Sequence, residues 1–170
     1  MNKIRFGLIG CGDIAHIRYF YSIPHFEEIE LVGIYDMNKP FLQKTAEELG
    51  VKAFNSYEEM LDDPTIDAVI VTTYHPSHTP LAIQALKAGK HVISEKPVSA
   101  SIEQAKQLKE AAAQTAKVLL AMHNDAYPQI ENVKALNEQG VIGEVCSIYS
   151  VFAHHGPLTA PLILDSEKSQ

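Results

Sequence analysis

The stretch Ile4-Arg5-Phe6-Gly7-Leu8-Ile9-Gly10-Cys11-Gly12-Asp13-Ile14-Ala15 decides the fold class of this chain. It begins as an apolar run with β-strand character and ends in two closely spaced glycines. A segment with helical spacing follows, from about residue 13 to residue 22, and stops before Pro24. A strand, a glycine-rich turn and a helix in direct succession are typical of a βα unit.

The same alternation continues along the chain. Apolar runs predict five further strands, at Ile29–Tyr35, near Lys52–Asn55, and at Ala68–Val71, His91–Ser94 and Val118–Ala121. Segments with helical spacing separate them. Six strands with intervening helices predict an α/β fold built on a doubly wound parallel sheet.

The regular alternation of predicted strands and helices ends after residue 123. A helix is expected over about 128–139 and a strand over Val145–Ala153, whereas 154–170 predicts no further element. The strand has no obvious pairing partner in the sequence.

Composition excludes several classes of protein. The 170 residues are 46% hydrophobic and 21% charged, which is typical of a globular chain, and the formal net charge of -7 disfavours nucleic-acid binding. No apolar run reaches the roughly 18 residues that a membrane span needs, so we expect a cytoplasmic protein without a membrane partner. Cys11 and Cys146 lack metal-ligand spacing and are interpreted as packing residues.

The glycine turn matches the pattern G-x-G-x-x-G/A, with Gly10, Gly12 and Ala15 at the fixed positions. Gly10 would allow the tight turn, Gly12 the close approach of a pyrophosphate, and Ala15 the packing of helix on strand. Asp13 and Ile14 begin the helix, whose N-terminal end favours phosphate. We expect Gly10, Gly12, Asp13 and Ile14 to bind a dinucleotide, the alternative being a plain glycine-rich turn.

Asp36 ends the second strand, where a carboxylate can accept hydrogen bonds from the adenosine ribose. Its charge would repel a 2'-phosphate and so favours NAD over NADP, although Lys39 lies nearby. The alternative is an aspartate that caps the next helix.

Two further loops follow central strands, at the edge of the sheet where ligands bind. The first contains Thr72, Thr73, Tyr74, His75 and His78, and its two histidines could instead form an H-x-x-H metal pair, for which the sequence offers no third ligand.

The second loop is Glu95-Lys96-Pro97. A lysine there can polarise a substrate hydroxyl and stabilise a developing alkoxide. A surface turn is the alternative interpretation.

These residues together resemble the Gfo/Idh/MocA family of nicotinamide-dependent oxidoreductases. The resemblance is carried by the glycine motif, Asp36, residues 73–78, the run Ala88-Gly89-Lys90-His91-Val92-Ile93-Ser94-Glu95-Lys96-Pro97 and the segment Gly140-Val141-Ile142-Gly143-Glu144. It extends from about residue 3 to residue 157.

The resemblance implies a Rossmann domain over 1–123, which binds NAD or, less readily, NADP, and the incomplete start of an α+β substrate and oligomerisation domain over 124–170. Lys96 matches the catalytic lysine of the family and Glu95 its neighbour in the nicotinamide site. Thr73 and His78 match the loop that lines the dinucleotide, and we expect Thr72 and Tyr74 of the same loop to bind the cofactor as well. No metal is implied.

The implied activity is hydride transfer between the nicotinamide and a sugar, polyol or related substrate, in a protein that forms a homo-oligomer at full length. The sequence departs from the family at Tyr74-His75, where a proline and an asparagine are usual, and it lacks the D-x-x-x-H-type motif expected after Lys168. We therefore expect this chain to bind cofactor without a complete active site. His154 and His155 are candidate substrate contacts, and a dinucleotide-sensing regulator on the same fold is the alternative function.

Overall fold

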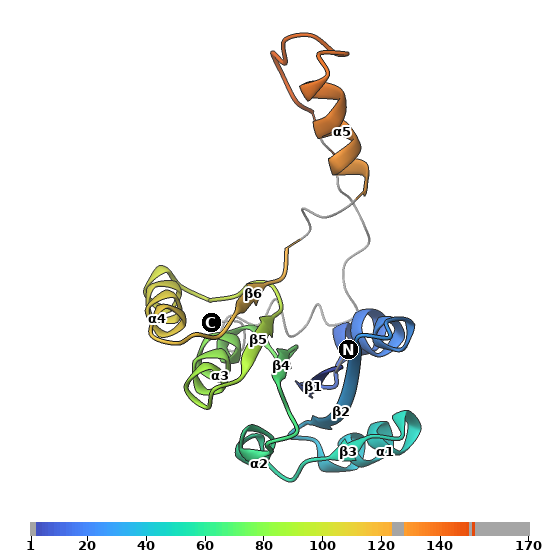
Figure 1. Cartoon of the computed structure of the whole chain (residues 1–170), viewed down its shortest axis with the longest axis vertical. Helices are drawn as coiled ribbons and strands as arrows, with labels where there is room; N and C mark the ends of the chain where they lie inside the picture. Colours follow the sequence, from blue (N-terminus) through green and yellow to red (C-terminus); the bar gives the residue numbers. More distant parts are fainter. Residues whose placement is uncertain (1–2, 124–127, 150, 152–170) are drawn as a thin grey trace. The chain divides into compact units, whose positions relative to one another are not determined.

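The computed structural model describes residues 3–123, 128–149 and 151, which divide into a first unit ending at Met122 and a second beginning at His123. Figure 1 labels the strands and α-helices of both units. In chain order the elements are β1 (Ile4–Ile9), η1 (Ala15–Phe20), η2 (Ile23–His25), β2 (Ile29–Tyr35), α1 (Lys39–Leu49), β3 (Lys52–Ala53), α2 (Tyr57–Asp62), β4 (Ala68–Val71), α3 (His75–Lys87), β5 (His91–Ser94), α4 (Ile102–Ala113), β6 (Leu119–Ala121) and α5 (Pro128–Glu138).

The six strands form one parallel sheet in the order β3-β2-β1-β4-β5-β6. The chain starts at β1 in the middle, builds outward through β2 and β3, and then crosses back to β4. This order confirms the predicted doubly wound sheet. It also places the switch point between β1 and β4, where the loops after neighbouring strands diverge and leave room for a ligand.

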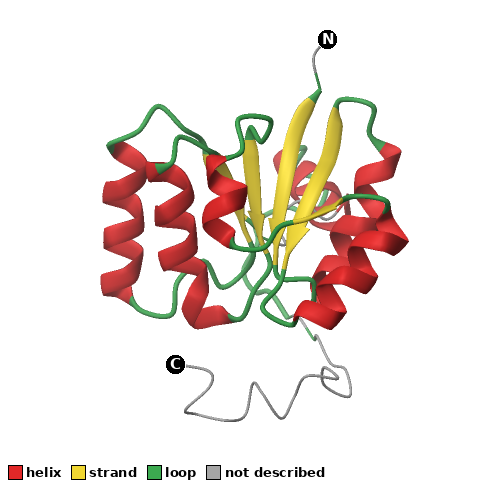
Figure 2. Cartoon of the chain, turned by 90° about the horizontal axis from the view of Figure 1, so that it is seen from below, coloured by secondary structure: helices red, strands yellow, loops and turns green. Residues whose placement is uncertain are grey.

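Helices cover both faces of the sheet (Figure 2). All four residues of β4 are buried, and they alternate between two apolar clusters. Val69 and Val71 pack in the cluster that contains buried side chains of α2, α3 and α4. Ala68 and Ile70 pack in the cluster that contains those of η1 and α1. Burial on both faces explains why this strand reads as a continuous apolar run in the sequence.

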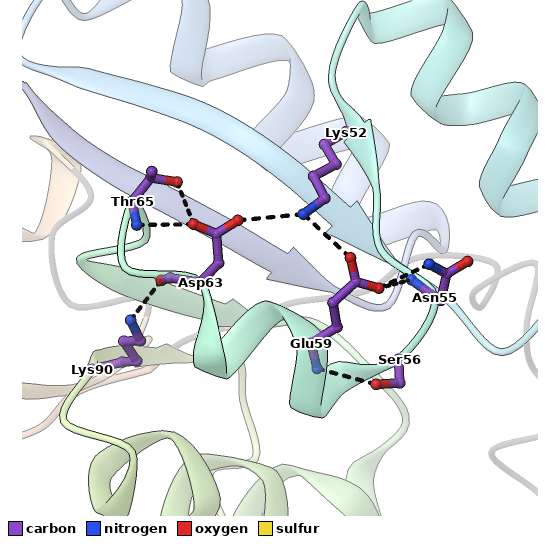
Figure 3. Close-up of polar contacts among 7 residues, drawn as sticks. All are labelled: Lys52, Asn55, Ser56, Glu59, Asp63, Thr65 and Lys90. Atoms are coloured by element: carbon purple, nitrogen blue, oxygen red, sulfur yellow. Dashed lines mark hydrogen bonds and ion pairs between the residues drawn. The ribbon is translucent and has the colours of Figure 1, made fainter.

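A polar network anchors the crossover from β3 to β4 (Figure 3). Lys52 Nζ lies 3.2 Å from Glu59 Oε1 and 3.3 Å from Asp63 Oδ2. Asp63 Oδ1 also accepts hydrogen bonds from the backbone N–H of Thr65, at 2.9 Å, and from its hydroxyl, at 2.6 Å. The buried Lys90 donates from Nζ to the carbonyl oxygen of Asp63, at 2.8 Å. The end of α2 is thereby fixed against the sheet.

The second unit departs from expectation at one element. The helix expected over about 128–139 is present as α5. The strand expected over Val145–Ala153 is wrong for residues 145–149 and 151, which form no strand in the structure. The physical reason is that a strand needs a hydrogen-bonded neighbour, and every strand in the described ranges belongs to the sheet of the first unit.

Other expectations for this end of the chain lie outside the described residues. They concern residues 150 and 152–153 of that strand, the segment 154–170, and the candidate contacts His154 and His155. Across the described residues, no helix combines the length and the apolar character needed to cross a membrane.

Candidate functional site

The glycine turn after β1 has one tightly enclosed position and one open position. Gly10 has a φ of +94°, and a Cβ placed on it would lie 2.7 Å from the backbone nitrogen of Thr73. Gly12 is exposed, and a Cβ placed there would meet no atom within 4 Å. Gly10 therefore serves the turn itself, while the absent side chain of Gly12 leaves the backbone open to a ligand.

The helix after the turn is less regular than its sequence predicts. Helical residues run from 13 through 22, but η1 in their middle is a π-helix. Ala15 at its start is completely buried, as close helix-on-strand packing requires, whereas Asp13 is exposed and Ile14 half-buried. The first helical N–H groups thus follow directly after the open glycine, where they favour an anion.

Asp36 holds the glycine turn from the end of β2. Its Oδ2 accepts a hydrogen bond from the backbone N–H of Cys11, and its Oδ1 accepts one from the N–H of Asn38, both at 2.8 Å. The N-terminal cap of α1 is Asn38, whose side chain accepts from the N–H of Phe41 at 3.2 Å. A carboxylate offers about four acceptor positions, so Asp36 can still accept hydrogen bonds from sugar hydroxyls.

The Lys39 side chain contacts Asn55 and Tyr35. Its Nζ donates to the carbonyl oxygen of Asn55 and lies 4.4 Å from the centroid of the Tyr35 ring. These two contacts engage the lysine that the sequence places near Asp36.

The loop after β4 is tied to the glycine turn by Thr72. The Thr72 hydroxyl is buried and lies 2.6 Å from the carbonyl oxygen of Gly10. Next to it, the hydroxyls of Thr73 and Ser77 lie 2.7 Å apart, and the Ser77 hydroxyl donates to the carbonyl oxygen of Tyr74. The Tyr74 side chain is 43% exposed at the start of α3. Thr72 therefore shapes the turn, whereas Tyr74 faces solvent.

Glu95, after β5, is only 2% exposed, unlike a residue of a plain surface turn. Its Oε1 accepts hydrogen bonds from Arg18 Nη1 at 2.9 Å and from the Tyr19 hydroxyl at 3.0 Å. Its Oε2 accepts from the backbone N–H of Lys96 at 3.1 Å. Burial, together with the negative charge of Glu95, raises the pKa of Tyr19, which keeps the phenol protonated and donating. The exposed side chain of Lys96 follows this buried anchor.

Sequence reasoning missed Arg18 and Tyr19. They lie on η1, in the helix after the glycine motif, and meet Glu95 across a separation of 77 and 76 residues. No local sequence pattern predicts a contact between residues so far apart in the chain. The pair connects the helix that would hold the phosphates to the loop that carries Lys96.

His78 is 1% exposed, and both of its ring nitrogens contact backbone carbonyl oxygens. Its neighbour His75 lies with its ring centroid 5.8 Å away, and burial, followed by the positive charges of His78 and Lys96, lowers the pKa of His75. An H-x-x-H metal pair would need a free ring nitrogen on each histidine. The two carbonyl contacts of His78 occupy both of its nitrogens, which argues against that alternative.

The two cysteines differ in environment. Cys11, in the glycine turn, is completely buried, and burial together with the nearby Asp36 carboxylate raises the pKa of its thiol to about 12. Cys146, in the second unit, is exposed. The packing role expected for Cys11 fits this burial, whereas the one expected for Cys146 does not.

The site residues thus gather at the carboxyl edge of the sheet, around the switch point. The profile of an oxidoreductase family with an NAD-binding Rossmann fold, named for Gfo, Idh and MocA, matches residues 4–123. The chain belongs to the Gfo/Idh/MocA oxidoreductase family. Its first unit is the NAD(P)-binding Rossmann domain of that family.

Curated relatives of two kinds are similar to the chain. An uncharacterized oxidoreductase, ORF334, from Rhizobium meliloti is 33% identical over 154 residues, which cover 89% of this chain and 46% of that protein. A glycosyl hydrolase family 109 protein from Shewanella sp. strain ANA-3 is 32% identical over 168 residues, covering 91% of this chain and 36% of that protein. The chain spans less than half the length of these relatives.

Solved structures of this family are similar as well. WlbA dehydrogenase from Bordetella pertussis, in complex with NADH and UDP-GlcNAcA, is 35% identical with a TM-score of 0.77, covering 84% of this chain and 44% of that one. KijD10, a 3-ketoreductase from Actinomadura kijaniata in complex with NADP and TDP-benzene, is 32% identical with the same TM-score of 0.77 and the same coverages of 84% and 44%. The family therefore includes proteins solved with either dinucleotide.

Proposed function

We propose that the protein transfers a hydride between a nicotinamide dinucleotide and a hydroxyl-bearing or carbonyl carbon of a sugar substrate. The sugar nucleotide UDP-GlcNAcA in the complex of WlbA supports a substrate of that class, and the TDP-benzene in the complex of KijD10 is a nucleoside diphosphate derivative as well. In this proposal, residues 1–123 bind the cofactor and 124–170 begin the substrate domain of a longer, oligomeric protein. The dinucleotide supplies the redox chemistry, and the protein orients it.

One observation carries the proposal. The exposed Gly12 backbone, the Asp36 carboxylate and Lys96 all follow strands that end at the same edge of the sheet. The absent Cβ of Gly12 leaves open space at the backbone, which a pyrophosphate would approach directly before the first helical N–H groups. Asp36 would hold the adenosine ribose at one end of the dinucleotide, and Lys96 would lie beside the nicotinamide at the other.

Lys96 has the chemistry needed by the reacting oxygen. Its exposed ammonium group can donate a hydrogen bond to a substrate hydroxyl or carbonyl and stabilise negative charge there during hydride transfer. The buried Glu95, held by Arg18 and Tyr19, accepts a hydrogen bond from the backbone N–H of Lys96 and so fixes the backbone that carries the Lys96 side chain. We assign Lys96 the catalytic role and Glu95 a positioning role.

We further propose that NAD(H) is preferred over NADP(H). The Asp36 carboxylate would repel a 2'-phosphate, and Lys39 is engaged by Asn55 and Tyr35 rather than held ready to neutralise it. KijD10 was solved with NADP, so cofactor preference differs among family members and has to be measured for each of them.

The test is a fluorescence titration of the 170-residue chain with NADH and, separately, with NADPH. We expect tighter binding of NADH, and we expect Asp36→Asn to weaken it by on the order of 10-fold, since a hydrogen bond to a charged group contributes about 1.5 kcal/mol or more. Asp62→Asn, at an exposed site on α2, is the matched control and should bind NADH as the unchanged chain does. Equal binding by the Asp36→Asn variant would contradict the assigned role of Asp36.

A second candidate function is hydrolysis of a glycosidic bond, which the glycosyl hydrolase family 109 relatives support. The α-N-acetylgalactosaminidase of Shewanella oneidensis, 30% identical over 168 residues, names one such activity. Net oxidation distinguishes the two candidates: a dehydrogenase accumulates NADH in step with product, whereas a hydrolase releases a sugar without net NADH. Incubation of the longer protein proposed above with NAD⁺ and either a UDP-sugar or a nitrophenyl N-acetylgalactosaminide, with both products monitored, decides between them.

A further inference from the structure

The buried carboxylate of Glu95 is held by three donors of this chain. Its Oε1 accepts hydrogen bonds from Arg18 Nη1, at 2.9 Å, and from the Tyr19 hydroxyl, at 3.0 Å. Its Oε2 accepts one from the backbone N–H of Lys96, at 3.1 Å. Two of the donors come from η1 and the third from the loop after β5, so the carboxylate connects that helix to the backbone of Lys96.

The winding of η1 explains how Arg18 and Tyr19 reach the same oxygen. Residues 15–20 form a π-helical turn, which contains more residues per turn than an α-helix does. Consecutive side chains on it therefore diverge by less than the roughly 100° of an α-helix. Two neighbouring residues can in this way present their polar ends to one carboxylate. Such turns occur frequently at functional sites, and this one lies in the helix that follows the glycine turn.

The surroundings of Arg18 favour its pairing with Glu95. Together with Tyr19, the Arg18 side chain lines a pocket of about 230 Å³, whose other lining residues are a serine and apolar side chains such as Ile23, Ile70 and Ile93. A charge beside such a surface is stabilised by an ion pair. In the part of the chain that the structure describes, Glu95 is the carboxylate within ion-pair distance of Arg18, at 2.9 Å.

We propose that Arg18 and Tyr19 are positioning residues, which act through Glu95 to place Lys96 beside the nicotinamide half of the dinucleotide. The proposal rests on the function proposed above, in which Lys96 is the catalytic residue. One helix would then serve both halves of the cofactor. Its first N–H groups would face the pyrophosphate, and its π-helical turn holds the loop after β5.

Two nucleotides separate these halves. ADP has only the adenosine and the pyrophosphate, which would contact Asp36 and the glycine turn. NADH has the nicotinamide as well, which would reach Lys96. Removal of either donor to Glu95 should therefore weaken the binding of NADH and leave that of ADP unchanged.

The first experiment measures hydrogen exchange of the Lys96 backbone amide in the ¹⁵N-labelled 170-residue chain, by nuclear magnetic resonance and without ligand. We expect exchange on the order of 10-fold faster in Arg18→Gln and in Tyr19→Phe, because the amide then donates to a carboxylate that is less firmly held. Tyr19→Phe keeps the ion pair of Arg18 with Glu95 and gives the answer even if Arg18→Gln does not fold.

The second experiment titrates the same variants with NADH and with ADP by calorimetry. We expect the affinity for NADH to fall by on the order of 10-fold, which is the contribution of one hydrogen bond from a charged group such as Lys96. The affinity for ADP should stay that of the unchanged chain.

Two substitutions elsewhere in the first unit are matched controls. Tyr57→Phe removes another buried tyrosine hydroxyl, which donates to the carbonyl oxygen of Leu81 at 3.0 Å. Arg5→Gln removes the arginine of the ion pair with Asp67. Both variants should match the unchanged chain in the exchange of the Lys96 amide and in the affinity for each nucleotide.

Two results would overturn the proposal. One is exchange of the Lys96 amide at the original rate in both variants. The other is an equal loss of affinity for NADH and ADP, which would assign the effect to the glycine turn. If the unchanged chain binds neither nucleotide, the proposed function fails, while the exchange measurement, made without ligand, still decides whether Arg18 and Tyr19 hold the backbone of Lys96.

Discussion

Gly10 and Gly12 are two residues apart, yet their surroundings predict opposite consequences of the same substitution. At Gly10 the backbone φ is +94° and a Cβ would lie 2.7 Å from the Thr73 nitrogen. We expect Gly10→Ala to lower the free energy of unfolding by about 2 kcal/mol, which is the scale of a strained left-handed backbone. Urea denaturation of the variant measures this loss.

Gly12→Ala is the matched control for folding. A Cβ at Gly12 meets nothing within 4 Å, so we expect a change in unfolding free energy of less than about 0.5 kcal/mol. The same methyl group would stand where the pyrophosphate is proposed to approach, and the variant should bind NADH more weakly. A stable Gly10→Ala variant, or an unstable Gly12→Ala variant, would contradict the roles assigned to the two glycines.

The geometry of the glycine turn could be predicted from the sequence because a local pattern marks it. The glycine spacing and the strand that precedes it predict a tight turn at Gly10 and an open backbone at Gly12, since turn chemistry acts over a few residues. The partners of Glu95 could not be found in this way, and neither could the carbonyl contacts of His78. Those depend on how η1, β4 and β5 come together in the folded sheet.

Helix caps are the interactions at the scale of an element that the sequence specifies most directly. Ser56 and Ser101 precede α2 and α4, and their hydroxyls accept hydrogen bonds from the N–H groups of Glu59, at 3.1 Å, and Gln104, at 3.2 Å. We expect Ser56→Ala and Ser101→Ala each to lower the free energy of unfolding by about 1 kcal/mol. Urea denaturation or thermal unfolding measures each loss.

Ser22 provides the comparison for both caps. It occupies the N-terminal position of η2, but its side chain makes no capping hydrogen bond. Ser22→Ala should therefore change stability much less than either capping variant. Equal losses in all three variants would show that removal of a hydroxyl, and not of a cap, explains the effect.

The strands and helices of the first unit follow the sequence pattern because each has a strong periodic or capping signal. Two features of the structure were not predicted from the sequence pattern. The π-helical winding of η1 depends on packing against the sheet, and helical spacing alone does not distinguish it from an α-helix. Residues 145–149 have an apolar, β-branched character but no pairing partner among the described residues, and propensity without pairing does not make a strand.

The stability of the whole molecule is expected to fall in acid because several carboxylates are held in their charged form. Hydrogen bonds from Thr65, followed by Lys52, lower the pKa of Asp63, and the backbone N–H of Arg5, followed by its guanidinium group, lowers that of Asp67. A carboxyl group with a folded pKa below its unfolded value stabilises the protein above the unfolded value, near about 4. That contribution is lost as the pH falls through the folded pKa.

Urea denaturation at a series of pH values from about 7 to about 2.5 measures this dependence. We expect a shallower loss of stability below about pH 4 in Asp63→Asn than in the unchanged chain, because one of the groups that must be protonated has been removed. Asp62→Asn, which changes the exposed neighbour, is the control and should keep the original slope. Identical slopes for all three proteins would mean that the network at the end of α2 does not contribute.

The contrast between Cys11 and Cys146 makes the native chain its own reporter of local opening. An alkylating reagent should modify the exposed Cys146 at once, whereas Cys11 is enclosed in the glycine turn and has a thiol pKa of about 12. Modification of the second thiol then requires the turn between β1 and the following helix to open. The rate of Cys11 alkylation, followed by mass spectrometry, then reports the rate of that opening. A dinucleotide bound at the turn would slow this alkylation, and no engineered label is needed to detect it.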